Sequence, residues 1–220
     1  MSEQTWERKK AGKNQISIRQ SLIYDVITVD KGLAMEKLET FALNEIRILN
    51  DSVTLAEELV SNFYKMSANQ WFHLKYDVKT LKELHSSEIV HGPCAQVVRY
   101  EGKRQSNPLG SSTFDFYKIC LQDHAILSKL RQYPDIKLFP FALYIVTHEL
   151  IHVVRFCKFL QHFHASFPEK MAEESRVHAR TREILGRVRS VPGLAEVLDF
   201  YHQWHNSPGD KNGGDKNLAT

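Results

Sequence analysis

The stretch ALYIVTHELIHVVRF (Ala142–Phe156) sets two histidines and one glutamate into an otherwise apolar run. Almost all of the remaining residues in this stretch are apolar, and Glu149 is the one charged residue before Arg155. His148 and His152 are four residues apart, so on a helix their side chains project from the same face, one turn apart. The stretch therefore predicts a mostly buried helix that carries a pair of imidazoles.

Two imidazoles in this relation can bind one tetrahedral Zn²⁺, with Zn–N distances of about 2.0–2.1 Å. Glu149 follows the first histidine and so lies beside such a metal, where a carboxylate can take a proton from the attacking water. The apolar neighbours supply the dry, low-dielectric surroundings that a catalytic metal needs. We therefore expect one Zn²⁺ per chain, with His148 and His152 as ligands and Glu149 as general base.

The motif also resembles the extended signature of the zincin metallopeptidases, in which HExxH is framed by uncharged residues and followed by a hydrophobic one. The framing residues that comply here are Val146, Thr147, Leu150, Ile151, Val153 and Val154. The resemblance is local, covering about Phe139–Leu185. The metzincin variant would require glycine at position 155 and histidine at 158, and Arg155 and Lys158 exclude it.

The gluzincin variant places a third ligand, a glutamate, on a following helix about twenty residues later. Glu173 and Glu174 lie 21 and 22 residues after His152. Glu174 is preferred because His178 follows it by four residues on the same face. Gluzincins often carry an acidic residue there to support the ligands, so histidine is a departure, and Glu173 remains an alternative. This part of the chain resembles the third-ligand helix of small intracellular gluzincins.

Further side chains are candidates for the same site. His162 and His164 could replace the glutamate as third ligand, although histidines near a helix C-terminus also interact favourably with the helix dipole. Tyr201, His202 and His205 could stabilise an oxyanion, a role that zincins give to a Tyr or His from a later segment. The alternative for these residues is an aromatic packing face.

The net charge of the chain limits which classes of binding partner are expected. Lys and Arg number 29 against 26 Asp and Glu, which is too small an excess to favour nucleic acid or an anionic membrane. A set of arginines forms a basic face that is expected to be solvated: Arg176, Arg180, Arg182, Arg187 and Arg189. The expected partner is a peptide or protein substrate.

Three cysteines without close spacing indicate neither a disulfide framework nor a zinc ribbon. No apolar segment follows the basic N-terminal residues, and no apolar run reaches the roughly 18 residues of a membrane span. These features predict a cytoplasmic protein without a secretory signal or a membrane anchor.

The rest of the chain predicts an α+β fold of the zincin-like type, with a small sheet packed on the metal-binding helix. Residues 1–15 and 206–220 are polar and are expected to be disordered, leaving a single domain over 16–205. Its N-terminal part, to about residue 90, is expected to be helical, and residues 91–205 are expected to carry the metal site and a C-terminal helical subdomain.

Individual elements follow from local patterns. Residues 16–29 fit either a strand or a short helix, and residues 32–66 fit two helices broken near Asn50–Ser52, where Asp51 or Ser52 would cap the second. Short β-branched or aromatic runs predict strands at Ala95–Tyr100 and Thr113–Leu121. Prolines predict helix boundaries: one helix stops at Pro134, the metal-binding helix runs from about Pro140 to Pro168, and the next ends at Pro192.

Two other classes of protein share some of these features. Glu149 and His152 form an ExxH pair, and Glu88 and His91 form a second, as in ferritin-like di-iron bundles. However, His91 runs directly into glycine and proline, where a bundle helix would continue. A non-catalytic zincin-like binding or regulatory protein is the other alternative, although a purely structural metal site has no need of Glu149.

Overall fold

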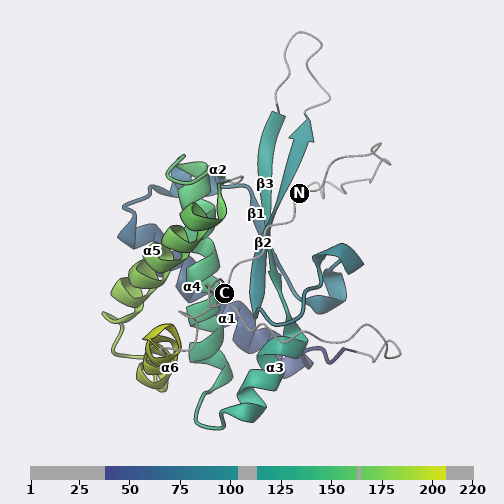
Figure 1. Cartoon of the computed structure of the whole chain (residues 1–220), viewed down its shortest axis with the longest axis vertical. Helices are drawn as coiled ribbons and strands as arrows, with labels where there is room; N and C mark the ends of the chain where they lie inside the picture. The colour runs from purple at the N-terminus through teal and green to yellow at the C-terminus, as the bar shows by residue number, and fades with distance from the viewer. Residues whose placement is uncertain (1–37, 104–112, 163–164, 207–220) are drawn as a thin grey trace, which may run out of the picture.

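The computed structural model describes residues 38–103, 113–162 and 165–206, which form a mixed α+β fold as predicted (Figure 1). The predicted lead-in and tail, the stretch at 16–29 and most of the turn-rich loop before Thr113 lie outside the described residues. The α-helices are α1 (Leu43–Phe63), α2 (Ala68–His73), α3 (Asp123–Gln132), α4 (Leu138–Cys157), α5 (Phe167–Leu185) and α6 (Leu194–Asn206). The strands are β1 (Tyr76–Lys79), β2 (Ala95–Lys103) and β3 (Thr113–Leu121).

The sheet has the order β1-β3-β2. The predicted pair of strands is confirmed: β2 and β3 run antiparallel, with Val97 opposite Ile119. The sequence did not predict β1, which pairs in parallel with β3 through the register Val78 to Ile119. All four residues of β1 are half-buried, so the strand lacks the alternation of buried and exposed positions that identifies a strand in a sequence.

The predicted break near Asn50–Ser52 is wrong, because α1 is one continuous helix of 21 residues. Ser52 does not cap a second helix. Its side chain is buried, and its hydroxyl donates a hydrogen bond of 2.7 Å to the carbonyl of Leu49 inside the same helix. Polar residues that favour caps in isolation are thus accommodated here, because α1 packs along α4.

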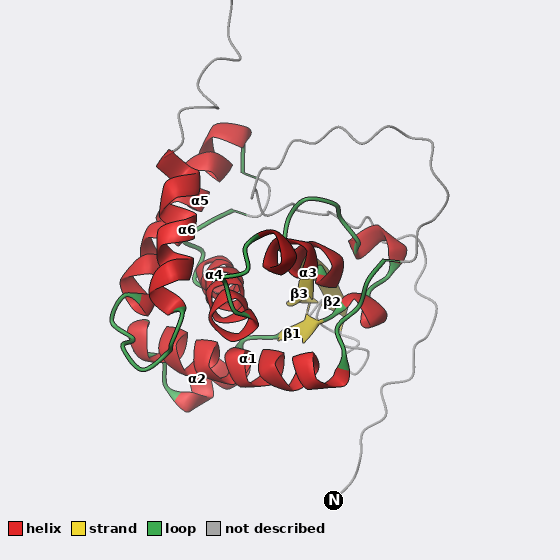
Figure 2. Ribbon diagram, turned by 90° about the horizontal axis from the view of Figure 1, so that it is seen from below, coloured by secondary structure: helices red, strands yellow, loops and turns green. Residues whose placement is uncertain are grey.

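Helix α4 lies in the middle of the molecule, with the strands on one side and α5 and α6 on the other (Figure 2). Sixteen of its residues are buried, and Phe156 stacks on Tyr117 of β3 with ring centroids 5.7 Å apart. The helix is long and apolar enough to cross a membrane, but 83% of its apolar window is buried inside the protein. Its apolar character is thus explained by its place in the core.

Helix α4 ends at Cys157, earlier than the predicted boundary at Pro168, which instead lies in the first turn of α5. The amide of Leu160 donates to the carbonyl of Arg155, and the amide of Phe159 donates to that of Phe156. These two bonds form a Schellman motif, with Phe159 in the left-handed conformation at φ 54°. Glycine usually occupies that position, so the sequence carried no signal for this helix end.

Glu88 anchors the loop before β2. Its carboxylate is 1% exposed, lies 2.6 Å from Lys118 Nζ and accepts a hydrogen bond from the hydroxyl of Tyr100. Its carbonyl oxygen accepts bonds from the side-chain amides of Gln96 and Gln122. Burial alone would raise the pKa of Glu88, but the hydrogen bonds from Lys118 and Tyr100 outweigh it and lower that pKa.

Glu88→Gln should lower the free energy of unfolding at neutral pH by about 1–3 kcal/mol, because the largely buried ammonium of Lys118 loses its counter-charge. A folded-state pKa below the ordinary value means that Glu88 stabilises the fold above the pKa of a free carboxyl. This contribution is lost as the pH falls through the lowered pKa. Urea unfolding at neutral and acidic pH should therefore show the difference between the two proteins shrinking in acid.

The double variant Glu88→Gln with Lys118→Met is the control, since it removes the uncompensated charge and should recover part of the loss. Equal stability of Glu88→Gln and the parent protein at neutral pH would contradict this account of the buried pair.

Candidate metal centre

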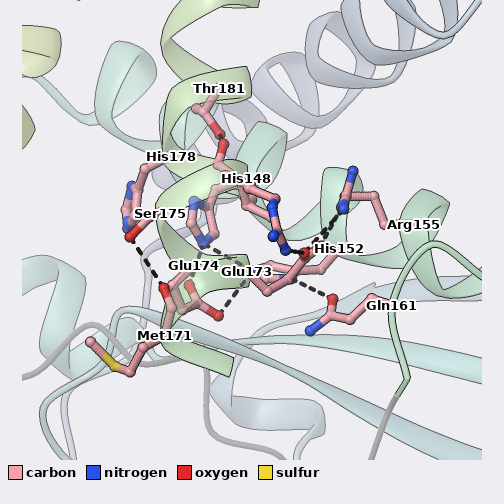
Figure 3. Close-up of polar contacts among 12 residues, drawn as sticks. His148, His152, Arg155, Gln161, Met171, Glu173, Glu174, Ser175, His178 and Thr181 are labelled. Atoms are coloured by element: carbon pink, nitrogen blue, oxygen red, sulfur yellow. Dashed lines mark hydrogen bonds and ion pairs between the residues drawn. The ribbon is translucent and has the colours of Figure 1, made fainter. Parts of the chain in front are cut away.

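Three side chains from two helices meet at one point of the core. His148 and His152 come from one face of α4, and Glu174 comes from α5, which packs against that face (Figure 3). All three are buried, with Glu174 the most exposed at 8%. They are the group of potential metal ligands found among the described residues, and they belong to the set that the sequence predicts.

The distances between the donor atoms suit a small tetrahedral cation. The two Nε2 atoms lie 3.2 Å apart, and each lies 3.2 Å from an oxygen of the Glu174 carboxylate. At Zn–ligand distances of about 2.0–2.1 Å, neighbouring donors of a tetrahedron are about 3.3–3.4 Å apart. Two imidazoles and one carboxylate are also the protein ligands of several catalytic zinc sites, which keep the fourth position open.

His152 and Glu174 shift each other's pKa values. Burial alone would lower the pKa of His152, but the Glu174 carboxylate outweighs this effect and raises it to about 9. Burial would likewise raise the pKa of Glu174, and the two imidazoles instead lower it far below the ordinary value. Glu174 is therefore ionised at neutral pH, and His152 must release a proton before its Nε2 can bind a metal.

Glu149 is completely buried and lies next to His148 in the sequence of α4. Its charge contributes to raising the pKa of three groups from different elements: His152 of α4, Tyr201 of α6 and Cys120 of β3. The carboxylate is thus close enough to groups of α4, α6 and the sheet to act on them electrostatically. A divalent cation would compensate the charge of the two buried carboxylates, Glu149 and Glu174.

Glu173, the alternative third ligand, is directed elsewhere. Its carboxylate accepts hydrogen bonds from both Nε and Nη2 of Arg155, the second at 3.0 Å, and from Nη1 of Arg176 at 3.2 Å. Figure 3 shows Glu173 paired with Arg155 while Glu174 faces the two histidines. The fork of Arg155 joins the end of α4 to α5, and this leaves Glu174 as the carboxylate at the imidazoles.

The structure adds Gln161, which the sequence did not suggest. Its side-chain oxygen lies 3.5 Å from Nδ1 of His152, so it can accept a hydrogen bond from the Nδ1–H of the tautomer that leaves Nε2 available for a metal. Gln161 reaches this place because the chain reverses at Phe159, directly after α4. A glutamine nine residues after a histidine carries no recognisable pattern, and only the reversal brings the two together.

His178 lies one helical turn beyond Glu174 on α5, as its spacing predicts, and packs against the site. Its ring centroid is 4.3 Å from that of His148, and its Nδ1 lies 2.8 Å from the hydroxyl of Tyr144. Tyr201 stacks on Tyr144 with centroids 3.8 Å apart. Burial raises the pKa of both tyrosines, so both hydroxyls stay protonated at neutral pH.

Among the described residues, no further candidate belongs to the group of three donors. His162 is exposed and does not belong to the group of potential ligands. His164 and the side chain of His205 lie outside the described residues. His202 is exposed beside Tyr201, where it lines a neighbouring pocket.

The second ExxH pair is not brought to this site. Glu88 is engaged with Lys118 and Tyr100 beside the sheet, and the ring of His91 packs edge-on against His124 of α3. Together with the three-stranded sheet, this placement gives no support to a helical di-iron bundle.

Comparisons of the chain with protein-family models, with curated proteins and with solved structures found no match. What the site does is therefore inferred from its own residues and their geometry.

Proposed function

We propose that the protein is a zinc-dependent metallopeptidase with a zincin-like fold and a gluzincin-type ligand set. The observation that carries the proposal is the convergence of His148, His152 and Glu174 at mutual donor distances of 3.2 Å. One Zn²⁺ per chain would be held by these three side chains. When bound, zinc would polarise the scissile carbonyl and lower the pKa of a water molecule at the site.

Glu149 is the proton carrier in this proposal. Its carboxylate takes a proton from the water that attacks the peptide carbonyl and delivers it to the leaving amine as the C–N bond breaks. The position of Glu149 beside the imidazoles, and not among the three donors, supports this role. Its buried surroundings exclude bulk water that would otherwise compete for the proton.

The donor for the oxyanion comes from the side of α5 and α6. Tyr201 keeps its proton at neutral pH because burial raises its pKa, so its hydroxyl can donate a hydrogen bond to a developing negative charge. His178 is the second candidate, since its ring packs against His148 and is positioned by the hydroxyl of Tyr144. His202 is more exposed and is assigned no part in this step.

A peptide or protein substrate also fits the sheet. Strand β2 is an edge strand that runs antiparallel to β3 and contacts α4. An extended peptide can add to such an edge through backbone hydrogen bonds that do not depend on its sequence. The edge of β2 therefore supports an extended polypeptide as the substrate.

The test compares two neighbouring glutamates. Glu174→Gln should weaken zinc binding by more than about 100-fold, because loss of a ligand exceeds the 10- to 100-fold effect of an outer-shell partner. Glu173→Gln should leave zinc binding within about tenfold, since its carboxylate belongs to Arg155 and Arg176. Zinc affinity is measured by competition with a chromogenic chelator, and peptide hydrolysis is measured on the zinc-loaded proteins.

Equal zinc affinity of Glu174→Gln and Glu173→Gln would exclude the gluzincin-type ligand set. Tight zinc binding without hydrolysis of any peptide in a mixed-sequence library would exclude the peptidase while leaving the metal site in place.

A further inference from the structure

A pocket of about 350 Å³ is lined in part by His178, whose ring packs against that of His148 with centroids 4.3 Å apart. It is formed between α4, α5 and α6 and shares no residue with the larger cavity beside α1, α2 and β1. Its lining residues are Tyr144, Ser175, His178, Ala179, Arg182, Leu198, Tyr201 and His202. Its volume lies within the range of about 300–1,000 Å³ that is usual for small-ligand pockets.

The lining of this pocket favours an anion. It contains the guanidinium of Arg182 and the imidazoles of His178 and His202, and it contains no carboxylate. Ser175 and the two tyrosines are neutral hydrogen-bonding groups. A negatively charged ligand would therefore meet positive charge and donors, with no acidic side chain to repel it.

Arg182 differs from the neighbouring arginines of α5 and of the turn that follows it. Arg176, Arg180 and Arg187 each pair with Glu173 or Glu183. Within the described parts of the chain, no carboxylate pairs with Arg182, which instead borders the pocket. Its charge acts on Tyr144, which also lines the pocket: burial raises the pKa of Tyr144, and the positive charge of Arg182 opposes that rise. Guanidinium groups suit carboxylates because they bind both oxygens at once.

The register of α5 aligns this cation with the candidate metal site. Glu174, His178 and Arg182 are spaced by four residues and so follow one face of the helix. Figure 3 shows Glu174, Ser175 and His178 along one stretch of α5. Eight residues of helix rise about 12 Å, and the long arginine side chain leans back toward the helix N-terminus, shortening the distance to the site.

One or two extended residues cover about 3.3–7 Å of that distance, and the reach of the guanidinium covers much of the remainder. A carboxylate held by Arg182 would then place the peptide bond one or two residues upstream at His148 and His152. The stacked rings of Tyr144 and Tyr201, together with Leu198, offer an apolar wall for the terminal side chain.

We infer that this pocket binds the C-terminal carboxylate of the peptide substrate through Arg182, so that the enzyme removes one or two residues from the C-terminal end. The inference rests on the proposed function and names its substrate class. In the reaction, water adds its oxygen to the scissile carbonyl carbon, the C–N bond breaks, and the amine of the released residue or dipeptide takes up the proton.

Binding is tested first, on the zinc-loaded full chain, with N-acetyl-L-phenylalanine and its C-terminal amide as probes in calorimetric titrations. The acid should bind roughly 10- to 100-fold more tightly than the amide, as expected for hydrogen bonds to a charged group. Arg182→Gln should abolish this preference, and Arg182→Lys should restore part of it. Arg180→Gln is the matched control, because Arg180 pairs with Glu183 on the same helix and does not line the pocket.

A preference that survives in Arg182→Gln would overturn the inference, since the carboxylate would then be bound by another group, such as the metal. Equal binding of acid and amide to the parent protein would overturn it as well. Zinc content and the unfolding temperature of each variant are measured alongside, and both should match the parent protein.

A hydrolysis assay distinguishes failure of the carboxylate pocket from failure of the proposed peptidase activity. Two peptides that differ only in a free or amidated C-terminus should be cleaved with kcat/KM values at least about tenfold apart in favour of the free acid. Equal cleavage of both would overturn the carboxylate pocket and leave the peptidase. Cleavage of neither, together with an Arg182-dependent preference in binding, would overturn the peptidase and retain the carboxylate site.

Discussion

Glu149→Gln should retain one zinc per chain and lose roughly 100- to 10,000-fold in kcat, the usual contribution of a general acid–base group. Glutamine has nearly the same shape as glutamate, so it should fit the fully buried position that Glu149 occupies. Its amide cannot accept a proton from water or return one to the leaving amine. The loss should therefore fall on kcat with KM little changed, as measured with a fluorogenic peptide and with zinc determined by mass spectrometry.

The matched control for this variant is Glu88→Gln, which alters another fully buried glutamate that is outside the donor group and bonded to Tyr100. It should lower stability and leave kcat within about twofold of the parent protein under conditions where both are folded. Near-parental kcat in Glu149→Gln would exclude Glu149 as the proton carrier. Loss of zinc in that variant would instead mean that Glu149 supports the ligands.

The second large effect concerns stability. Zinc at about a thousandfold excess over its dissociation constant should stabilise the folded chain by about 4 kcal/mol, because the unfolded chain lacks the assembled ligand set. For a domain of this size, that corresponds to a rise in Tm of about 8–16 °C. His148→Ala removes a proposed ligand, an imidazole that is 1% exposed and joins α4 to Glu174 of α5. Its Tm should not respond to zinc or to a chelator.

Scanning calorimetry of both proteins with and without zinc tests this expectation. His124→Ala is the control, because His124 is a half-buried histidine of α3 outside the donor group, and it should keep the full response to zinc. A zinc-dependent rise in the Tm of His148→Ala equal to that of the parent protein would show that the metal binds elsewhere.

The fold was predictable where local patterns agree with the final packing. The β-branched and aromatic runs at 95–100 and 113–121 predicted two strands, and both exist, paired antiparallel. The four residues of β1 were not predicted, because their stability as a strand comes from pairing with β3 and not from their own pattern. The break expected near Ser52 was wrong, since packing of α1 on α4 overrides the local preference for a cap.

The sequence by itself determined the pairing of His148 and His152. Residues four apart on a helix share a face whatever surrounds the helix, and the apolar neighbours of the motif already required burial. The pairing depends only on the local geometry of a helix. The third ligand was suggested by the resemblance to gluzincins, which pointed to Glu173 or Glu174, and His162 and His164 remained alternatives.

Only the tertiary structure decided between the two glutamates and assembled the surroundings of the site. Adjacent residues on a helix point about 100° apart, so the rotation of α5 against α4 selects one of them. Arg155 holds Glu173, and Glu174 therefore faces the imidazoles. Gln161 and Arg182 reach the site and its pocket through a chain reversal and a helix packing, which arise from contacts between distant segments and leave no pattern in the sequence.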